Sequence, residues 1–213
     1  MIVEFAGLPR SGKSTCIDVA KDYFARRGIT VRIAGEAVRF CPFGNQHRVE
    51  IACWAANCAL NAVLEASLDT DPQTLTLQYR GLFDALAFLR LLWKESYISR
   101  DTLSCLEEYF ADRRWTERVD LVILFDVEPE AVLERDIARY IARQVYGEDL
   151  PGVITNESTL QALRDCYNEI RADFRDRFNI KKLDASQVTM VDLVKQVVEH
   201  IMKEYERQAV ETS

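Results

Sequence analysis

Short apolar runs alternate with longer amphipathic segments along the whole chain. The run LVILF at 121–125 is continuous rather than alternating, which is typical of a strand buried on both faces of a parallel sheet. The pattern predicts five strands, at 2–6, 30–34, 74–78, 121–127 and 180–183. It predicts seven helices, at 13–27, 47–67, 82–96, 101–114, 130–145, 157–177 and 189–208. This alternation indicates an α/β fold with a parallel five-stranded sheet.

The composition is that of an ordinary globular protein. The 213 residues contain no linker-like segment, so we expect a single domain over 1–213. The net charge of −7 argues against nucleic acid or an anionic membrane surface as a partner. We see no secretory leader and no apolar stretch long enough for a bilayer, so we expect a cytoplasmic protein with no membrane partner. The six cysteines have no CxxC spacing and are expected to be small buried apolar residues.

The segment GLPRSGKST at 7–15 lies between the first strand and the first helix. It fits the pattern G-x-x-x-x-G-K-[ST] through Gly7, Gly12, Lys13 and Ser14. The glycines let successive N–H groups turn toward an anion, and the helix adds its positive end. We expect Lys13 to hold the β- and γ-phosphates of ATP during catalysis and the Ser14 hydroxyl to bind Mg²⁺. The other loop residues expected to contact ATP are Pro9, Arg10, Ser11 and Thr15. A glycine-bearing turn without a ligand is the alternative.

Several further segments resemble the thymidylate kinase and deoxynucleoside kinase branch of the phosphate-loop nucleoside and nucleotide kinases. Besides GLPRSGKST they are QYRGLFDALAFL, DLVILFDVEPEAVLERD and KKLDAS, and together they span most of the chain in the expected order. The resemblance implies a three-layer α/β/α sandwich whose ligands bind at the carboxyl ends of the strands. It also implies that Asp184, Ala185 and Ser186 line the adenine of ATP.

The resemblance implies catalytic roles for two residues that follow strands. Glu36 stands where the resembled kinases have a carboxylate that accepts the proton of the attacking hydroxyl, although a solvated loop carboxylate is the alternative. Arg80 corresponds to the arginine of an acidic-arginine pair and would offset charge on the transferred phosphoryl group. The residue before it is Tyr79, and a phenol cannot replace a carboxylate as a Mg²⁺ ligand. Either Ser14 and the ATP phosphates bind Mg²⁺ with help from a carboxylate elsewhere in the chain, or the chain has lost much of its kinase activity. The carboxylates considered are those of Glu36, Asp84 and Asp126.

Arg135, Arg139 and Arg143 recur every four residues and therefore share one face of a helix. In the resembled kinases such arginines stand beside a closing lid, which we expect here at about 135–157. Arg135 is expected to bind the nucleotide, and Arg139 and Arg143 to act in catalysis. The alternative is an exposed stripe that pairs with neighbouring acidic residues.

The acceptor pocket is expected between the segment 39–54 and the helix that begins at Leu82. There, Phe40, Trp54 and Phe83 could stack on a base and Arg39 could bind a phosphate, although each aromatic could instead belong to the core. The helix at 47–64 is apolar around most of its circumference and needs a cover. The resembled kinases commonly dimerise through helices in this region, so a homodimer is expected.

Three functions fit these features. The first is ATP- and Mg²⁺-dependent transfer of the γ-phosphoryl group to a nucleoside or nucleoside monophosphate, as in thymidylate kinase. The second, motivated by Tyr79, is a nucleotide-binding regulator or degenerate kinase homologue without efficient transfer. The third is an NTP-hydrolysing switch, which the missing Asn-Lys-x-Asp run disfavours. The base of the acceptor is not specified by the sequence.

Overall fold

A five-stranded parallel sheet forms the centre of the molecule. The computed structural model describes residues 1–35, 40–44, 46–69, 71, 73–146 and 156–211, and for 139–146, 209 and 211 the description covers the backbone alone. The strands are β1 (Ile2–Gly7), β2 (Thr30–Ala34), β3 (Thr74–Tyr79), β4 (Leu121–Asp126) and β5 (Ile180–Asp184). Their order in the sheet is β2-β3-β1-β4-β5, and every neighbouring pair is parallel. The predicted sheet is therefore confirmed.

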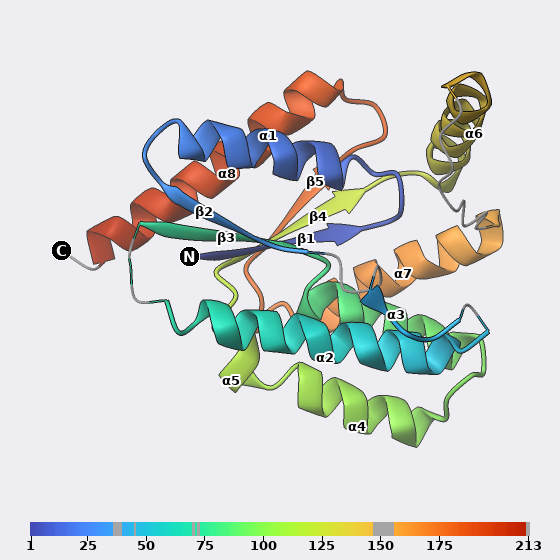
Figure 1. The fold of residues 1–213 in the computed structure, drawn as a ribbon. Helices are drawn as coiled ribbons and strands as arrows, with labels where there is room; N and C mark the ends of the chain where they lie inside the picture. The colour runs from blue at the N-terminus through green and yellow to red at the C-terminus, as the bar shows by residue number, and fades with distance from the viewer. Residues whose placement is uncertain (36–39, 45, 70, 72, 147–155, 212–213) are drawn as a thin grey trace.

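Helices cover both faces of this sheet (Figure 1). The helices of the described residues are α1 (Lys13–Ala25), α2 (Arg48–Ala66), α3 (Leu82–Lys94), α4 (Arg100–Phe110), α5 (Arg113–Thr116), α6 (Pro129–Tyr146), α7 (Glu157–Asp173) and α8 (Met190–Glu211). Helices α1 and α8 lie on one face, and α2, α3 and α7 lie on the other, with α4 and α5 outside them. This arrangement is the predicted three-layer α/β/α sandwich. None of the helices in the described residues is long and apolar enough to cross a lipid bilayer.

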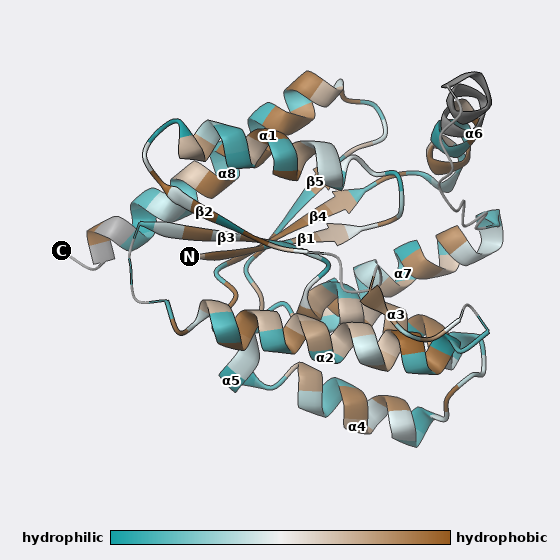
Figure 2. Cartoon of the chain, in the orientation of Figure 1, coloured by the Kyte–Doolittle hydropathy of each residue, from teal (hydrophilic) through white to brown (hydrophobic). Residues whose placement is uncertain are grey.

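The core follows from the strand order. The middle strands β1, β3 and β4 are buried along almost their whole length, and they carry the apolar residues that Figure 2 shows at the centre of the molecule. The outer strands β2 and β5 are partly exposed, because each has a neighbour on one side only. Helix α3 is apolar and almost entirely buried, since α2, α4 and α7 pack around it.

Two predictions about local structure need correction. The helix predicted at 101–114 is two helices, because the Asp112 side chain accepts a hydrogen bond from the amide of Arg114 and begins a new helical turn there. The cysteines are all free, but only Cys16 and Cys166 are buried, while Cys105 is exposed. Burial raises the pKa of the Cys16 and Cys166 thiols to about 12, so these two are protonated apolar side chains.

Candidate active site

The loop between β1 and α1 has an unusual backbone. Gly7 and Gly12 have φ angles of 133° and 98°, and Arg10 between them has a φ of 58°. Gly7 pairs with Phe125 of β4, and a Cβ on Gly7 would lie 2.4 Å from the Phe125 carbonyl oxygen. Only glycine fits this position, because both the φ angle and the space exclude a side chain. The loop therefore begins at a glycine fixed by the sheet itself.

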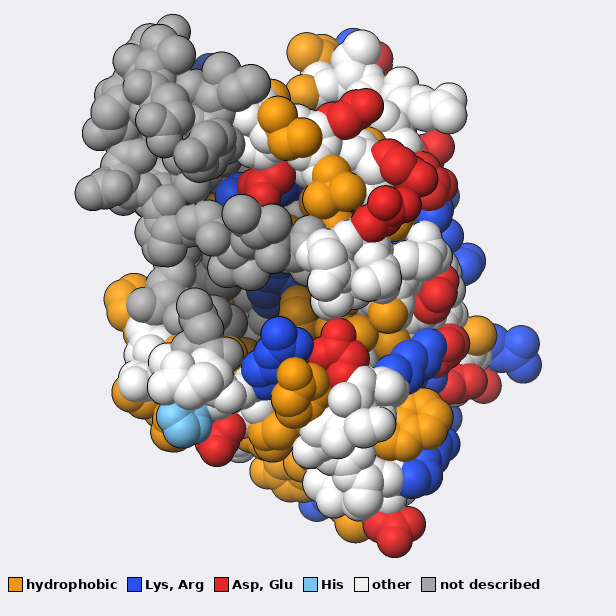
Figure 3. All heavy atoms as spheres, turned by 90° about the vertical axis from the view of Figure 1, so that its right-hand side faces the viewer, with side chains coloured by type: hydrophobic (Ala, Val, Ile, Leu, Met, Phe, Trp, Pro, Cys, Tyr) orange, Lys and Arg blue, Asp and Glu red, His pale blue; other side chains and the backbone are white. Residues whose placement is uncertain are grey.

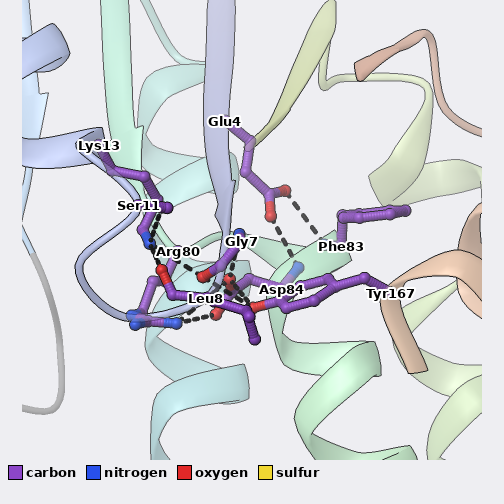
Figure 4. A network of polar contacts seen from close by, with 9 residues as sticks. All are labelled: Glu4, Gly7, Leu8, Ser11, Lys13, Arg80, Phe83, Asp84 and Tyr167. Carbon is purple, nitrogen blue, oxygen red and sulfur yellow. Dashed lines mark hydrogen bonds and ion pairs between the residues drawn. The ribbon is translucent and has the colours of Figure 1, made fainter. Parts of the chain in front are cut away.

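The ammonium group of Lys13 lies inside this loop. The side chain is only 8% exposed, and its Nζ donates to the carbonyl oxygens of Gly7 at 2.9 Å and Leu8 at 2.7 Å and to the Ser11 hydroxyl at 3.1 Å (Figure 4). The loop thus holds a cation at the amino-terminal end of α1, where the helix dipole also favours an anion. Ser14 and Thr15 follow in the first turn and are exposed. These residues fit a polyphosphate with a bound cation.

Arg80 reaches the same loop from β3. Its amide donates to the Phe5 carbonyl oxygen at 3.2 Å, and its φ of 53° is uncommon for a residue other than glycine. Its guanidinium donates to the Asp84 carboxylate, with Nη1 at 3.0 Å from Oδ2. The same carboxylate accepts the amide of Gly7 at 3.3 Å. Asp84 therefore links Arg80 to the start of the loop.

Arg135 lies between the loop and the carboxyl end of β5. Its guanidinium donates to the carbonyl oxygens of Arg10 at 3.0 Å and Ala185 at 2.6 Å. Arg10 also pairs with Asp136, with 2.8 Å between Nε and Oδ1. Helix α6 is thus tied to the phosphate loop by two contacts. Asp184 and Ser186 share the predicted adenine loop, where the Ser186 amide donates to the Asp184 carboxylate at 2.8 Å.

Comparison with solved structures gives the same arrangement of elements. The chain is similar to a deoxyadenosine kinase from M. mycoides solved with dCMP as product and a flexible dCDP, at 16% identity over 97% of this chain and 100% of that one, with a TM-score of 0.64. The structures with dATP (15% identity, TM-score 0.65) and dCTP (16%, 0.57) have the same coverage. The chain has the fold of these deoxyadenosine kinases. No family model and no curated protein sequence matches it.

The edge of the sheet where the strands end carries many charges. Figure 3 looks onto this edge and shows Lys and Arg side chains beside Asp and Glu side chains. A cavity of about 400 Å³ opens there, lined in part by Asp126, Arg164 and Lys182. Asp126 accepts from Arg164 at 2.7 Å and pairs with Lys182 at 2.8 Å. Although burial raises the pKa of Asp126, its hydrogen bonds to these two cations outweigh that effect, so the pKa lies below its usual value.

The predicted acceptor residues have different surroundings. Phe40 is 80% exposed, and Trp54 on α2 is exposed as well. Phe83 is completely buried, with its ring centroid 6.2 Å from that of Tyr167 and 5.6 Å from that of Phe178. The prediction that Phe83 stacks on a base is therefore wrong, because α3 turns this side chain into the core. Of the remaining predicted residues, Glu36 and Arg39 and the side chains of Arg139 and Arg143 lie outside the described part of the chain.

Glu4 is a buried residue of the site that the sequence analysis missed. Glu4 lies in β1, and its carboxyl oxygens accept hydrogen bonds from the amides of Phe83 at 3.1 Å and Asp84 at 2.8 Å. Both amides belong to the first turn of α3. Gly81 leaves room for this carboxyl group, since a Cβ there would lie 2.4 Å from Oε2 and the Glu4 side chain would have to shift. Burial raises the pKa of Glu4 to about 8, although the Asp84 amide lowers it. The sequence feature that could have revealed Glu4 is a single acidic residue in the otherwise apolar strand IVEFAG.

The raised pKa of Glu4 predicts a dependence of stability on pH. Between its ordinary pKa of 4.5 and about 8, the folded chain keeps a proton that the unfolded chain has lost. This contribution is therefore fully present below pH 4.5 and is lost as pH rises toward about 8, by up to about 1.4 kcal/mol per pH unit. We expect urea unfolding of wild type and Glu4→Gln at pH 5, 6, 7 and 8 to show this fall in wild type only. Parallel pH profiles would contradict the assignment.

Proposed function

We propose that the protein is a kinase that transfers the γ-phosphoryl group of ATP to a hydroxyl group of a nucleoside or nucleoside monophosphate. The observation that supports this most is the convergence of two cations on one loop. Lys13 lies within the loop, and Arg80 is joined to its first glycine through Asp84. The fold of the M. mycoides kinase, which was solved with nucleotides bound, supports the same class of substrate.

Several residues of the chain would hold Mg·ATP. The backbone N–H groups of Leu8 and of residues 10–13, the Lys13 ammonium and the hydroxyls of Ser14 and Thr15 would bind the phosphates and the metal. Asp184, Ala185 and Ser186 would line the adenine, and Arg135, which donates to the Ala185 carbonyl oxygen, would also bind the nucleotide. When bound, Mg·ATP supplies the phosphoryl group and part of the positive charge that offsets it. Lys13 would exchange the loop carbonyl oxygens for phosphate oxygens, which are stronger acceptors.

The transfer itself would need a base and charge stabilisation. The acceptor oxygen forms a bond to the γ-phosphorus while the bond to the β-phosphate oxygen breaks, and Glu36 takes the proton of the acceptor hydroxyl. Arg80 would stabilise the charge that develops on the moving group, with Arg139 and Arg143 closing over it from a lid at about 135–157. Closure would exclude water and so favour transfer over hydrolysis.

Ser14 is the protein ligand that we propose for Mg²⁺. The carboxylate of Asp126 is already bonded to Arg164 and Lys182, and that of Asp84 to Arg80 and Tyr167. Tyr79 places a phenol, 3.5 Å from Asp18, where the resembled kinases have an acid. Phosphate oxygens and water would complete the coordination of the metal, with Glu36 as a further ligand or neighbour.

We also propose which residues bind the acceptor. Arg39, Phe40 and Trp54 would form the acceptor site, which a thymidylate kinase-like protein would use for a nucleoside monophosphate. Leu64 is an exposed apolar residue of α2, and we propose that a homodimer forms through this helix. We expect the protein to act in the cytoplasm, on a small-molecule acceptor.

Labelled ATP tests this function directly. [γ-³²P]ATP with Mg²⁺ is offered with a panel of nucleosides and nucleoside monophosphates, and the products are separated by thin-layer chromatography. We expect label in one class of acceptor, together with one ADP per labelled product. ATP binding without any labelled acceptor would favour the regulatory alternative, and release of labelled phosphate regardless of the acceptor would favour a hydrolase.

A further inference from the structure

We infer that Asp84 is a positioning residue that holds the guanidinium of Arg80 against the phosphate loop. This inference rests on the proposed phosphoryl transfer, because Arg80 is the residue through which Asp84 would act. Asp84 lies in the first turn of α3 and is 2% exposed, so solvent does not compete for its carboxylate.

The Asp84 carboxylate joins three separate parts of the chain (Figure 4). Its Oδ1 accepts the amide of Gly7 at 3.3 Å and the hydroxyl of Tyr167 in α7 at 2.6 Å. Its Oδ2 lies 3.0 Å from Nη1 of Arg80, which follows β3. A buried carboxylate is tolerated only when charge and hydrogen bonds compensate for its lost hydration. The arrangement therefore fixes all three partners relative to one another.

Arg80 gains a defined orientation from these contacts. An arginine side chain has many rotamers. A cation that is already oriented stabilises the developing charge more than one that must change its rotamer during the reaction. Here the guanidinium pairs with Asp84, and its Cζ also lies 5.3 Å from the centroid of the Phe88 ring. Both Asp84 and Phe88 belong to α3, so this helix presents Arg80 to the loop.

Asp84 is itself held in place from two sides. Glu4 accepts the Asp84 amide at 2.8 Å and so fixes the beginning of α3. Tyr167 bonds to the Asp84 carboxylate while its ring packs on Phe83, and its hydroxyl also lies 3.2 Å from the Gly7 carbonyl oxygen. Burial raises the pKa of Tyr167 well above its usual value, so the hydroxyl stays a donor. The position of Arg80 therefore depends on residues far from it in the sequence.

The substitution Asp84→Asn tests the inference, because it keeps the shape of the side chain and removes its charge. We expect kcat to fall by about a hundredfold while KM for ATP changes by less than about threefold, since Arg80 would act mainly on charge that develops during transfer. Combining Asp84→Asn with Arg80→Met should give no lower a kcat than Arg80→Met alone, because Asp84 acts through Arg80.

Asp173→Asn is the matched control. Asp173, at the end of α7, also pairs with an arginine, Arg90, at 2.6 Å, and this arginine pairs with Glu107 of α4 as well. The substitution should leave kcat within about twofold of wild type, because Asp173 itself is exposed and Arg90 keeps its ion pair with Glu107. A second readout needs no turnover, namely ¹⁵N NMR of the Arg80 guanidinium. Rotation about its Nε–Cζ bond should be slow in wild type and Asp173→Asn and fast in Asp84→Asn.

The outcomes separate this inference from the proposed function. If wild type transfers phosphoryl groups but Asp84→Asn retains full kcat, or if its effect adds to that of Arg80→Met, the positioning role is overturned. If wild type transfers nothing, the proposed function fails and the NMR result alone decides whether Asp84 orients Arg80. If Asp84→Asn does not fold, Tyr167→Phe replaces it in both readouts, because it removes the hydrogen bonds of this hydroxyl to Asp84 and to the Gly7 carbonyl oxygen and keeps the ring contact with Phe83.

Discussion

Replacement of Lys13 by methionine is expected to lower kcat for phosphoryl transfer by about a hundredfold to a thousandfold and to weaken the binding of ATP. The methionine side chain has a similar length but no charge, so the loop loses the cation that lies 2.7–2.9 Å from its carbonyl oxygens. The ammonium group would otherwise stabilise negative charge on the transferred group. Steady-state kinetics with the acceptor found in the labelling assay measures the change.

Lys21→Met is the control for the Lys13 variant. Lys21 lies in the same helix, but its side chain is exposed, so kinetics close to wild type are expected. Urea unfolding of both variants separates a local effect from unfolding, because the loss of the Lys13 ammonium also removes donors from Gly7 and Leu8. An unchanged kcat and ATP affinity in a folded Lys13→Met protein would contradict the assigned site.

Replacement of Gly7 by alanine is expected to lower the free energy of unfolding by about 3 kcal/mol or more. The added Cβ would lie 2.4 Å from the carbonyl oxygen of Phe125, which belongs to the neighbouring strand and cannot move away freely. The φ of 133° adds backbone strain. Chemical denaturation of wild type and variant measures the difference.

Gly28→Ala serves as the matched control for Gly7→Ala. Gly28 also has a positive φ, 81°, but a Cβ there would meet nothing within 4 Å. Only the strain of the backbone remains, which corresponds to about 1 kcal/mol. Equal losses of stability at Gly7 and Gly28 would show that the contact with β4 does not restrict the start of the loop.

The fold could be predicted from the sequence because its signals are local. Short apolar runs mark β1 and β4, alternating Thr and Leu residues mark β3, and segments of helical periodicity separate the strands. The phosphate loop is a pattern within nine residues, and Arg80 was identified from the resemblance, at the end of the third predicted strand. The position of Lys13 inside the loop follows from the same short segment.

The polar network under the loop could not be predicted in this way. Glu4, Asp84 and Tyr167 are far apart in the sequence, and their meeting depends on which side of α3 faces β1 and α7. Helix α3 is apolar on nearly every side, so its periodicity does not determine this orientation. The same ambiguity led to the wrong prediction for Phe83, which packs on Tyr167 instead of facing the acceptor.

The break between α4 and α5 has another cause. A single side chain, Asp112, accepts the amide of Arg114 and competes with the continuing helix. An apolar pattern that extends through both helices does not reveal such a competition.

We propose that the loop between β1 and α1 binds the polyphosphate of a nucleotide. Displacement of a fluorescent ATP analogue by ADP and by AMP, each with Mg²⁺, tests it most directly. We expect ADP to compete at least about a hundredfold better than AMP with wild type, because the loop would bind the β-phosphate. This preference should disappear in Lys13→Met. Equal competition by ADP and AMP with wild type, or an undiminished preference in Lys13→Met, would contradict the claim.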